Sequence, residues 1–259
     1  MVDEQLLIVQ SSGPVRVRLA QASDLSGLQA LGVGFISEGN PHRQVMQQSE
    51  LTPALMQYLQ AQPFQTELWM AQAYPEAPLE PLEIQPFLRS LRGQPFLFSM
   101  LGALDGIEDP ERFPVGDHWP LSCLDRERAF CLLLERLRRL WQEGYPDAEM
   151  RLALMADYAS RLRQLNSHSF SCWDGSTLYA YSDGSPARGL ACIQLEGTQF
   201  SLPELGIPLE ITADETVTIS LVGTATLLGQ GATLIENGQL CSFVRGALAD
   251  SCDPVRLWG

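Results

Sequence analysis

Residues Asp125–Leu133, with the sequence DRERAFCLL, begin the clearest helix in this chain. Apolar side chains recur there at intervals of three and four residues, which places them on one face of a helix: Ala129, Leu132, Leu133, Leu137 and Leu140. Gly144 and Pro146 interrupt the pattern. We therefore expect a helix from Ser122 or Asp125 to about Gln142.

Strand-like runs lie on both sides of this helix and of a second one that we expect over residues 148–165. Before the helices, we expect strands at residues 5–9, 15–20, 31–36, 68–71 and 95–100, short helices at 24–30 and 51–61, a turn at Ser11–Pro14 and a loop at 75–86. After them, we expect only strands, at 168–173, 177–182, 189–195, 207–211, 216–222, 225–228, 232–236 and 239–244. The glycines of the 31–36 strand indicate a close approach of another backbone. The order of elements predicts one α+β domain over residues 1–259, with an all-strand part from about residue 181.

The composition is that of a soluble globular protein. The 259 residues are 45% hydrophobic and 19% charged, and the formal net charge is -14 with no lysine in the chain. This charge argues against nucleic acid, whose phosphates require clustered cations. No apolar run approaches the roughly 20 residues of a membrane-spanning helix, and the acidic start Met1–Gln5 is unlike a signal peptide. We expect a cytoplasmic protein that does not bind membranes.

The six cysteines do not form a recognisable site. They show no C-x-x-C pair and no nearby histidine at metal-ligand spacing, and the first of them is Cys123. We therefore expect no metal and no cofactor, and cysteines that are mostly small buried residues.

Four segments, in this order, resemble motifs of one enzyme family, the class II glutamine amidotransferases of the small stand-alone kind. Gln29–Gly39 is similar to D-G-W-G-[IV]-G-[FW]-Y, and Phe98–Gly102 to F-x-H-N-G. Asp125–Leu133 is similar to D-S-E-x-x-F-x-L-L, and Cys172–Ala180 to S-D-G-x-x-L-[YF]-A. A weaker match relates Glu83–Phe87 to N-T-H-P-F. The resemblance implies the N-terminal-nucleophile fold, a four-layer αββα sandwich of two antiparallel sheets.

The resemblance also implies where the catalytic groups would stand. In this family, a cysteine exposed by loss of Met1 attacks the glutamine amide, and its own α-amino group activates the thiol. Val2 occupies that position here. Because a branched alkyl group cannot attack a carbonyl, we expect the chain to lack the nucleophile.

Two further family groups are absent from the matching positions. In the family, the Asn side chain and the Gly N–H of H-N-G stabilise the oxyanion, and here the triplet is Met100-Leu101-Gly102. Gly102 keeps its N–H, but Leu101 offers no donor. The family's arginine that holds the substrate carboxylate falls at Ala71, or at Gln72 if the register slips by one residue.

Asp125 matches the family aspartate that binds the substrate α-amino group. It therefore joins Gly102 and Gln72 as a candidate substrate-binding residue. The alternative is that Asp125 only caps the helix that it precedes, and that Glu127 is a solvated residue.

These positions predict a class II amidotransferase-like protein without glutaminase activity, a pseudoenzyme that acts as a binding or regulatory partner. Its partner would be a synthetase or amidotransferase subunit, or a small amino-acid-like ligand. One alternative is an active amidotransferase whose N-terminal cysteine is missing from this chain. The other is a small-molecule sensor with a more apolar pocket.

Overall fold

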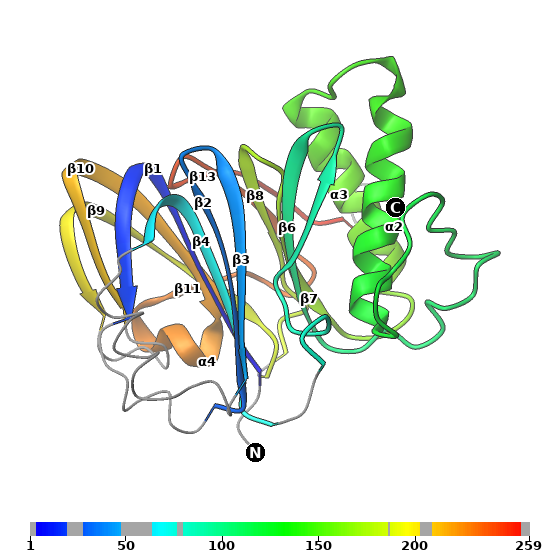
Figure 1. Cartoon of the computed structure of the whole chain (residues 1–259), viewed down its shortest axis with the longest axis horizontal. Helices are drawn as coiled ribbons and strands as arrows, with labels where there is room; N and C mark the ends of the chain where they lie inside the picture. The colour runs from blue at the N-terminus through cyan, green and yellow to red at the C-terminus, as the bar shows by residue number, and fades with distance from the viewer. Residues whose placement is uncertain are drawn as a thin grey trace.

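Strand-forming sequence at both ends of the chain pairs into two antiparallel sheets that lie face to face (Figure 1). The structure is a computed structural model that describes residues 4–19, 28–47, 64–76, 80–185, 187–202 and 209–254. The expected helices at 24–30 and 51–61 fall mostly or wholly outside the described residues.

One sheet has seven strands in the order β11-β9-β10-β1-β4-β2-β3. Their bounds are β1 Gln5–Leu19, β2 Ala30–Ser37, β3 Asn40–Gln47, β4 Phe64–Tyr74, β9 Leu190–Leu202, β10 Leu209–Thr224 and β11 Thr233–Leu234. The other sheet has six strands in the order β13-β12-β8-β7-β6-β5. These are β5 Phe87–Leu91, β6 Gln94–Leu101, β7 Ser169–Trp173, β8 Thr177–Tyr181, β12 Leu240–Val244 and β13 Ala247–Cys252.

Two long helices, α2 Asp125–Leu140 and α3 Ala148–Leu162, cover the outer face of the six-stranded sheet (Figure 1). The apolar face expected from the sequence is buried: Ala129, Leu133 and Leu137 are at most 1% exposed and pack against that sheet. A short helix, α4 Ala225–Leu228, packs on the outer face of the seven-stranded sheet. The expected α+β class and the two stacked antiparallel sheets are thus confirmed. No helix among the described residues has the length and apolarity needed to cross a membrane.

The layer between the sheets positions the candidate site. Leu6, Ile8 and Met70 of the seven-stranded sheet pack there against Leu97 and Leu101 of the six-stranded sheet. Alternate residues of each strand face this layer and the opposite face, as the two-residue period of a strand requires.

Several expected element boundaries are wrong. The expected turn at Ser11–Pro14 is a bulge within the continuous strand β1, where the register shifts between Ser11 and Arg16. A bulge tolerates Pro14, which has no N–H for the ladder. Residues 225–228 form helix α4, not a strand, because a four-residue apolar run has no readable period.

Candidate functional site

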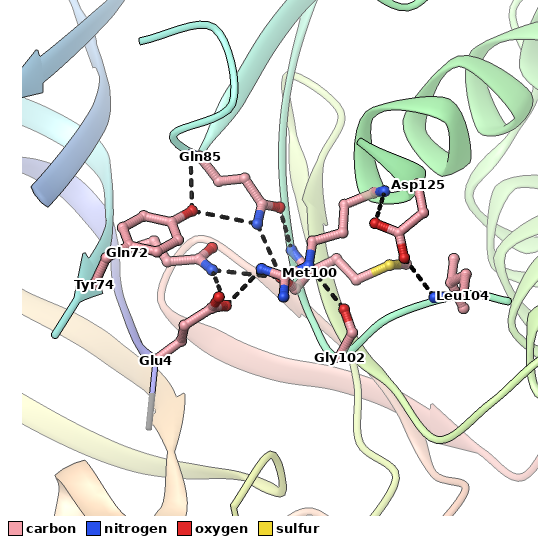
Figure 2. Close-up of polar contacts among 9 residues, drawn as sticks. Glu4, Gln72, Tyr74, Gln85, Met100, Gly102, Leu104 and Asp125 are labelled. Carbon is pink, nitrogen blue, oxygen red and sulfur yellow. Dashed lines mark hydrogen bonds and ion pairs between the residues drawn. The ribbon is translucent and has the colours of Figure 1, made fainter. Parts of the chain in front are cut away.

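The site lies between the sheets, at the end of the sandwich where the described chain begins (Figure 2). Glu4 just before β1, Gln72 on β4, Gly102 just after β6 and Arg126 on α2 are linked there by hydrogen bonds. Arg126 donates from one terminal nitrogen to Glu4 Oε2 at 2.5 Å and from Nε to the Gly102 carbonyl at 2.7 Å. The start of the chain and the start of a helix are therefore tied together at this point.

The structure places Gln72, and not Ala71, at the site. Side chains of β4 alternate between the layers, so Ala71 packs on the outer face of its sheet while Gln72 faces the six-stranded sheet. Gln72 is fully buried, and its Nε2 donates to Glu4 Oε2 at 3.1 Å and to the Met100 carbonyl at 3.4 Å. Its Oε1 has no partner among the described residues.

Leu101 and Gly102 form the end of β6 and the turn that follows it. The Leu101 side chain is 1% exposed and packs in the layer between the sheets. Gly102 has a φ of 98°, and a Cβ there would lie 2.7 Å from the Ser167 carbonyl oxygen. Only glycine fits this backbone without strain.

Gln85, in the loop before β5, connects that loop to β6 through hydrogen bonds. Its side chain is fully buried, accepts from the Met100 N–H at 2.7 Å and donates to the Met100 carbonyl at 3.0 Å (Figure 2). The Gln85 backbone N–H donates to the Tyr74 hydroxyl at 2.9 Å. A Cβ on Gly32 would lie 1.8 Å from the Gln85 carbonyl oxygen, which confirms the close backbone approach expected from the glycines. These contacts hold the backbone immediately before Leu101.

Asp125 lies beside the site, and its carboxylate is occupied by backbone groups. One oxygen accepts from the Leu104 N–H and the other from the Arg126 N–H at 2.8 Å (Figure 2). The helix cap itself is Leu124, whose extended φ and ψ of −70° and 132° precede the first helical residue. The expectation that Asp125 is the cap is therefore wrong by one position, although its charge still favours the positive end of the helix.

Glu127 is buried, contrary to the expectation of a solvated residue. It is 2% exposed, accepts from the backbone N–H groups of Leu121 and Ser122, and pairs with Arg89. These donors hold the pKa of its carboxyl below the ordinary value, although burial alone would raise it. Glu127 thus fixes the entry into α2.

Charge within the site is balanced by the pair that Arg126 makes with Glu4. Burial would lower the pKa of the Arg126 guanidinium, but the Glu4 carboxylate outweighs it and the pKa is raised. Burial also raises the pKa of Tyr74, and the Glu4 carboxylate adds to that effect. The site therefore holds a neutral phenol and a paired guanidinium cation at ordinary pH.

Burial disfavours the thiolate, and raises the pKa, of five of the six described cysteines. Burial raises the pKa of Cys131 to about 11 and that of Cys241 to about 12, and it also raises the pKa of Cys172. Cys123 is exposed in the loop before α2. Within the described ranges, no group of three or more His, Cys, Asp or Glu side chains is arranged to hold a metal ion.

The sequence missed Glu4, Arg126 and Tyr74 as members of the site. Glu4 and Arg126 lie 122 positions apart, and no local pattern links them. Gln85 falls within the weak match at Glu83–Phe87, which was the one available signal. Val2, the residue at the expected nucleophile position, lies outside the described residues.

Comparison with known proteins gives matches over nearly the whole chain. A family model described as glutamine amidotransferases class-II matches residues 20–256. A predicted glutamine amidotransferase from Pseudomonas aeruginosa PA01 superimposes with a TM-score of 0.73 at 18% identity, covering 95% of this chain and 99% of that one. No curated protein gives a significant match.

Two further structures share the fold. The glutamine phosphoribosylpyrophosphate amidotransferase from B. subtilis, complexed with ADP and GMP, has a TM-score of 0.58 at 11% identity; 96% of this chain corresponds to 49% of that chain. A glutamine aminotransferase class-II domain protein from Silicibacter pomeroyi has a TM-score of 0.55 at 14% identity, covering 96% and 98% of the two chains. At these identities, the likeness shows the fold alone.

Proposed function

This chain belongs to the class II glutamine amidotransferases, and we propose that within this family it is a member that does not hydrolyse glutamine. We propose that it acts instead as a non-catalytic binding or regulatory partner. The partner would be a synthetase or another amidotransferase subunit, because members of the family hand ammonia to such proteins.

The observation that carries the proposal is the side chain of Leu101. It stands where the family motif has the oxyanion-stabilising asparagine, and it packs among apolar residues between the sheets. An isobutyl group has no N–H to offer to a developing oxyanion. Loss of one such donor lowers the rate of acyl transfer by about 10²–10³-fold.

The neighbouring positions support the same proposal. At the position where the resemblance places the cysteine of the family, this chain has Val2, and an isopropyl group cannot attack a carbonyl. Gln72 reaches the site where the family uses an arginine from the same strand, and an amide cannot form the bidentate, charge-assisted contact with a carboxylate. Arg126 does not supply the missing carboxylate contact either, because its guanidinium already pairs with Glu4.

A reactive glutamine analogue tests the missing nucleophile directly. In an analogue with a diazoketone in place of the amide, the diazomethyl carbon takes up a proton, an attacking side chain or terminal amine forms a bond to that carbon, and N2 leaves. We expect no adduct within the first ten residues of the purified chain, and an unchanged intact mass for the Cys123→Ser variant. The Cys123→Ser variant is the matched control, since it removes an exposed thiol that would react without any site. One equivalent of adduct within the first ten residues, in both proteins, would contradict the proposal.

Partnership is tested by co-expression with any synthetase that is encoded beside this gene. Co-elution of the two chains in gel filtration, at a mass equal to their sum, is the expected result. Separate elution from every such candidate would contradict a role as a stable subunit.

A second candidate function, a small-molecule sensor, is favoured by Gln72. Its Oε1 is fully buried and has no partner among the described residues, so a ligand N–H bound there would satisfy it. A thermal-shift series with amino acids, amides and amines tests this. Stabilisation that disappears in Gln72→Met supports the sensor, and no stabilisation by any compound contradicts it.

A further inference from the structure

The Glu4 side chain occupies a cradle of donors that recognises a carboxylate. Its Oε2 accepts from Arg126 Nη1 at 2.5 Å and from Gln72 Nε2 at 3.1 Å (Figure 2). The two donors come from α2 and β4, whereas Glu4 immediately precedes β1. A guanidinium with an amide N–H beside it is suited to an anionic oxygen. The structure therefore shows which chemistry this cradle binds, and the group bound there belongs to the same chain.

The two donors are held in place by contacts that do not involve Glu4. Arg126 Nε donates to the Gly102 carbonyl at 2.7 Å. Gln72 Nε2 also donates to the Met100 carbonyl at 3.4 Å. These bonds remain when the Glu4 side chain leaves, so the cradle is preorganised for another carboxylate.

Asp125 is a second carboxylate beside Arg126, but it does not fill the cradle. Its oxygens accept from the backbone N–H groups of Leu104 and Arg126. The guanidinium donates instead to Gly102 and Glu4. Among the described residues, Glu4 is therefore the carboxylate that would leave this guanidinium exposed to a ligand when it is displaced.

Both side chains of the ion pair are partly open to solvent, Glu4 by 30% and Arg126 by 17%. Gln72 is fully buried, so a ligand reaches its N–H by taking the place of the Glu4 carboxylate. Gln5, the next residue, pairs with Ala73 of β4. This pairing tethers the Glu4 carboxylate beside the cradle, where it competes as an intramolecular ligand.

We propose that Glu4 is an autoinhibitory side chain, and that Arg126 and Gln72 form a site for the carboxylate of a small molecule, which binds by displacing Glu4. This inference rests on the binding role proposed for the site, and it names the ligand class and the regulation. A hydrogen-bonded charged pair must be broken before the ligand binds. The tethered carboxylate therefore weakens an external carboxylate by at least about tenfold.

The Glu4→Ala variant tests the proposal with acetate, whose heavy atoms match those that the substitution removes. NMR on the full chain follows the side-chain amide of Gln72 at constant ionic strength. We expect a saturable shift in Glu4→Ala, with an affinity at least about tenfold higher than that of the wild type. Acetamide has the same shape without the charge, and we expect no saturable shift with it in either protein.

Two further variants localise the effect. Glu215→Ala removes one exposed carboxylate beside the far end of β1, and we expect it to bind acetate as the wild type does. Glu4→Ala/Arg126→Met lacks the guanidinium, and we expect no saturable shift with acetate. If that double variant does not fold, the comparison of acetate with acetamide in Glu4→Ala still tests the need for charge.

Three results would overturn the proposal. They are no saturable shift in Glu4→Ala up to roughly 100 mM acetate, equal affinities for acetate in Glu4→Ala and the wild type, or equal binding of acetate and acetamide.

Failure of the proposed function gives a different result. Release of glutamate from glutamine would contradict the non-catalytic role and leave the acetate result unchanged. Stabilisation of the wild type by a ligand that requires Gln72, without acetate binding by Glu4→Ala, would overturn the autoinhibition alone.

Discussion

Glu4 and Arg126 form an ion pair across the site, with 2.5 Å between Glu4 Oε2 and the Arg126 guanidinium. Their side chains are 30% and 17% exposed, so both charges are partly removed from water. The same guanidinium donates to the Gly102 carbonyl. One arginine thus connects the start of the chain, the turn after β6 and the first turn of α2.

We predict a measurable coupling between these two residues. A double-mutant cycle of Glu4→Gln and Arg126→Met should give an interaction free energy of about 1–2 kcal/mol, because the pair is hydrogen-bonded and half-buried. Urea unfolding of the four proteins measures it. The exposed pair Arg16–Asp214 provides the control, and its coupling is expected to be smaller because solvent screens both charges. Equal coupling in the two pairs would contradict the prediction.

Gly102→Ala should destabilise the fold by more than backbone strain alone. Gly106 also has a positive φ, 86°, but a Cβ there meets nothing within 4 Å, whereas a Cβ on Gly102 meets the Ser167 carbonyl at 2.7 Å. We expect the free energy of unfolding to fall by about 1 kcal/mol in Gly106→Ala and by at least about 2 kcal/mol in Gly102→Ala. Chemical denaturation measures both changes. If the two variants lost similar free energies of unfolding, the turn after β6 would accommodate the added methyl group, and the prediction would be wrong.

Stability should fall in acid partly through Glu135. The hydrogen bond from Arg138 holds the pKa of this carboxyl at about 2, against the burial that would raise it, and Arg139 assists. Since the folded pKa lies below the ordinary value of 4.5, the contribution is present above pH 4.5 and is lost as the pH falls toward about 2.

The stability lost in acid depends on how strongly solvent screens the two arginines that pair with Glu135. Their side chains are 33% exposed for Arg138 and 60% exposed for Arg139. After discounting for their solvent screening, we expect the wild type to lose about 1–2 kcal/mol more than Glu135→Gln between pH 5 and pH 2. Parallel pH profiles for the two proteins in urea unfolding would contradict this assignment.

Arg151 should be far more important to stability than Arg161, which lies on the same helix, α3. Arg151 pairs at 3.0 Å with Asp174, and the two side chains are 10% and 1% exposed. The Arg151→Met variant leaves a buried carboxylate without its cation, which costs about 3–5 kcal/mol. Arg161→Met breaks a pair whose arginine is 56% exposed and should cost less than about 1 kcal/mol. Thermal unfolding checks the contrast, and equal changes in Tm would contradict it.

The parts of the fold that were predictable from sequence are those with a periodic buried face. The α2 helix has such a face, and so does the inward side of β6, where Leu97 and Leu101 alternate with outward Phe98 and Met100. The edge strands β3 and β13 were missed because few of their side chains are buried. Such strands are held by backbone pairing on one side and need no apolar alternation.

The candidate site was predictable only where a family motif marks it. Gly102, Gln72 and Asp125 were identified in this way, and the structure brings Gln72 and the Gly102 carbonyl into one hydrogen-bonded cluster, with Asp125 beside it. Glu4 was not identified, since its role depends on a contact with a residue more than a hundred positions away. The alternation of β4 decided between Ala71 and Gln72, and the sequence had left that choice open.

Release of glutamate from glutamine by the purified full chain tests the proposed loss of activity most directly. With Val2 and Leu101 at the two decisive positions, we predict a rate indistinguishable from that of buffer alone. Turnover in the range of ordinary enzymes, about 1–10³ s⁻¹, would contradict the proposal and show that this site still cleaves the amide.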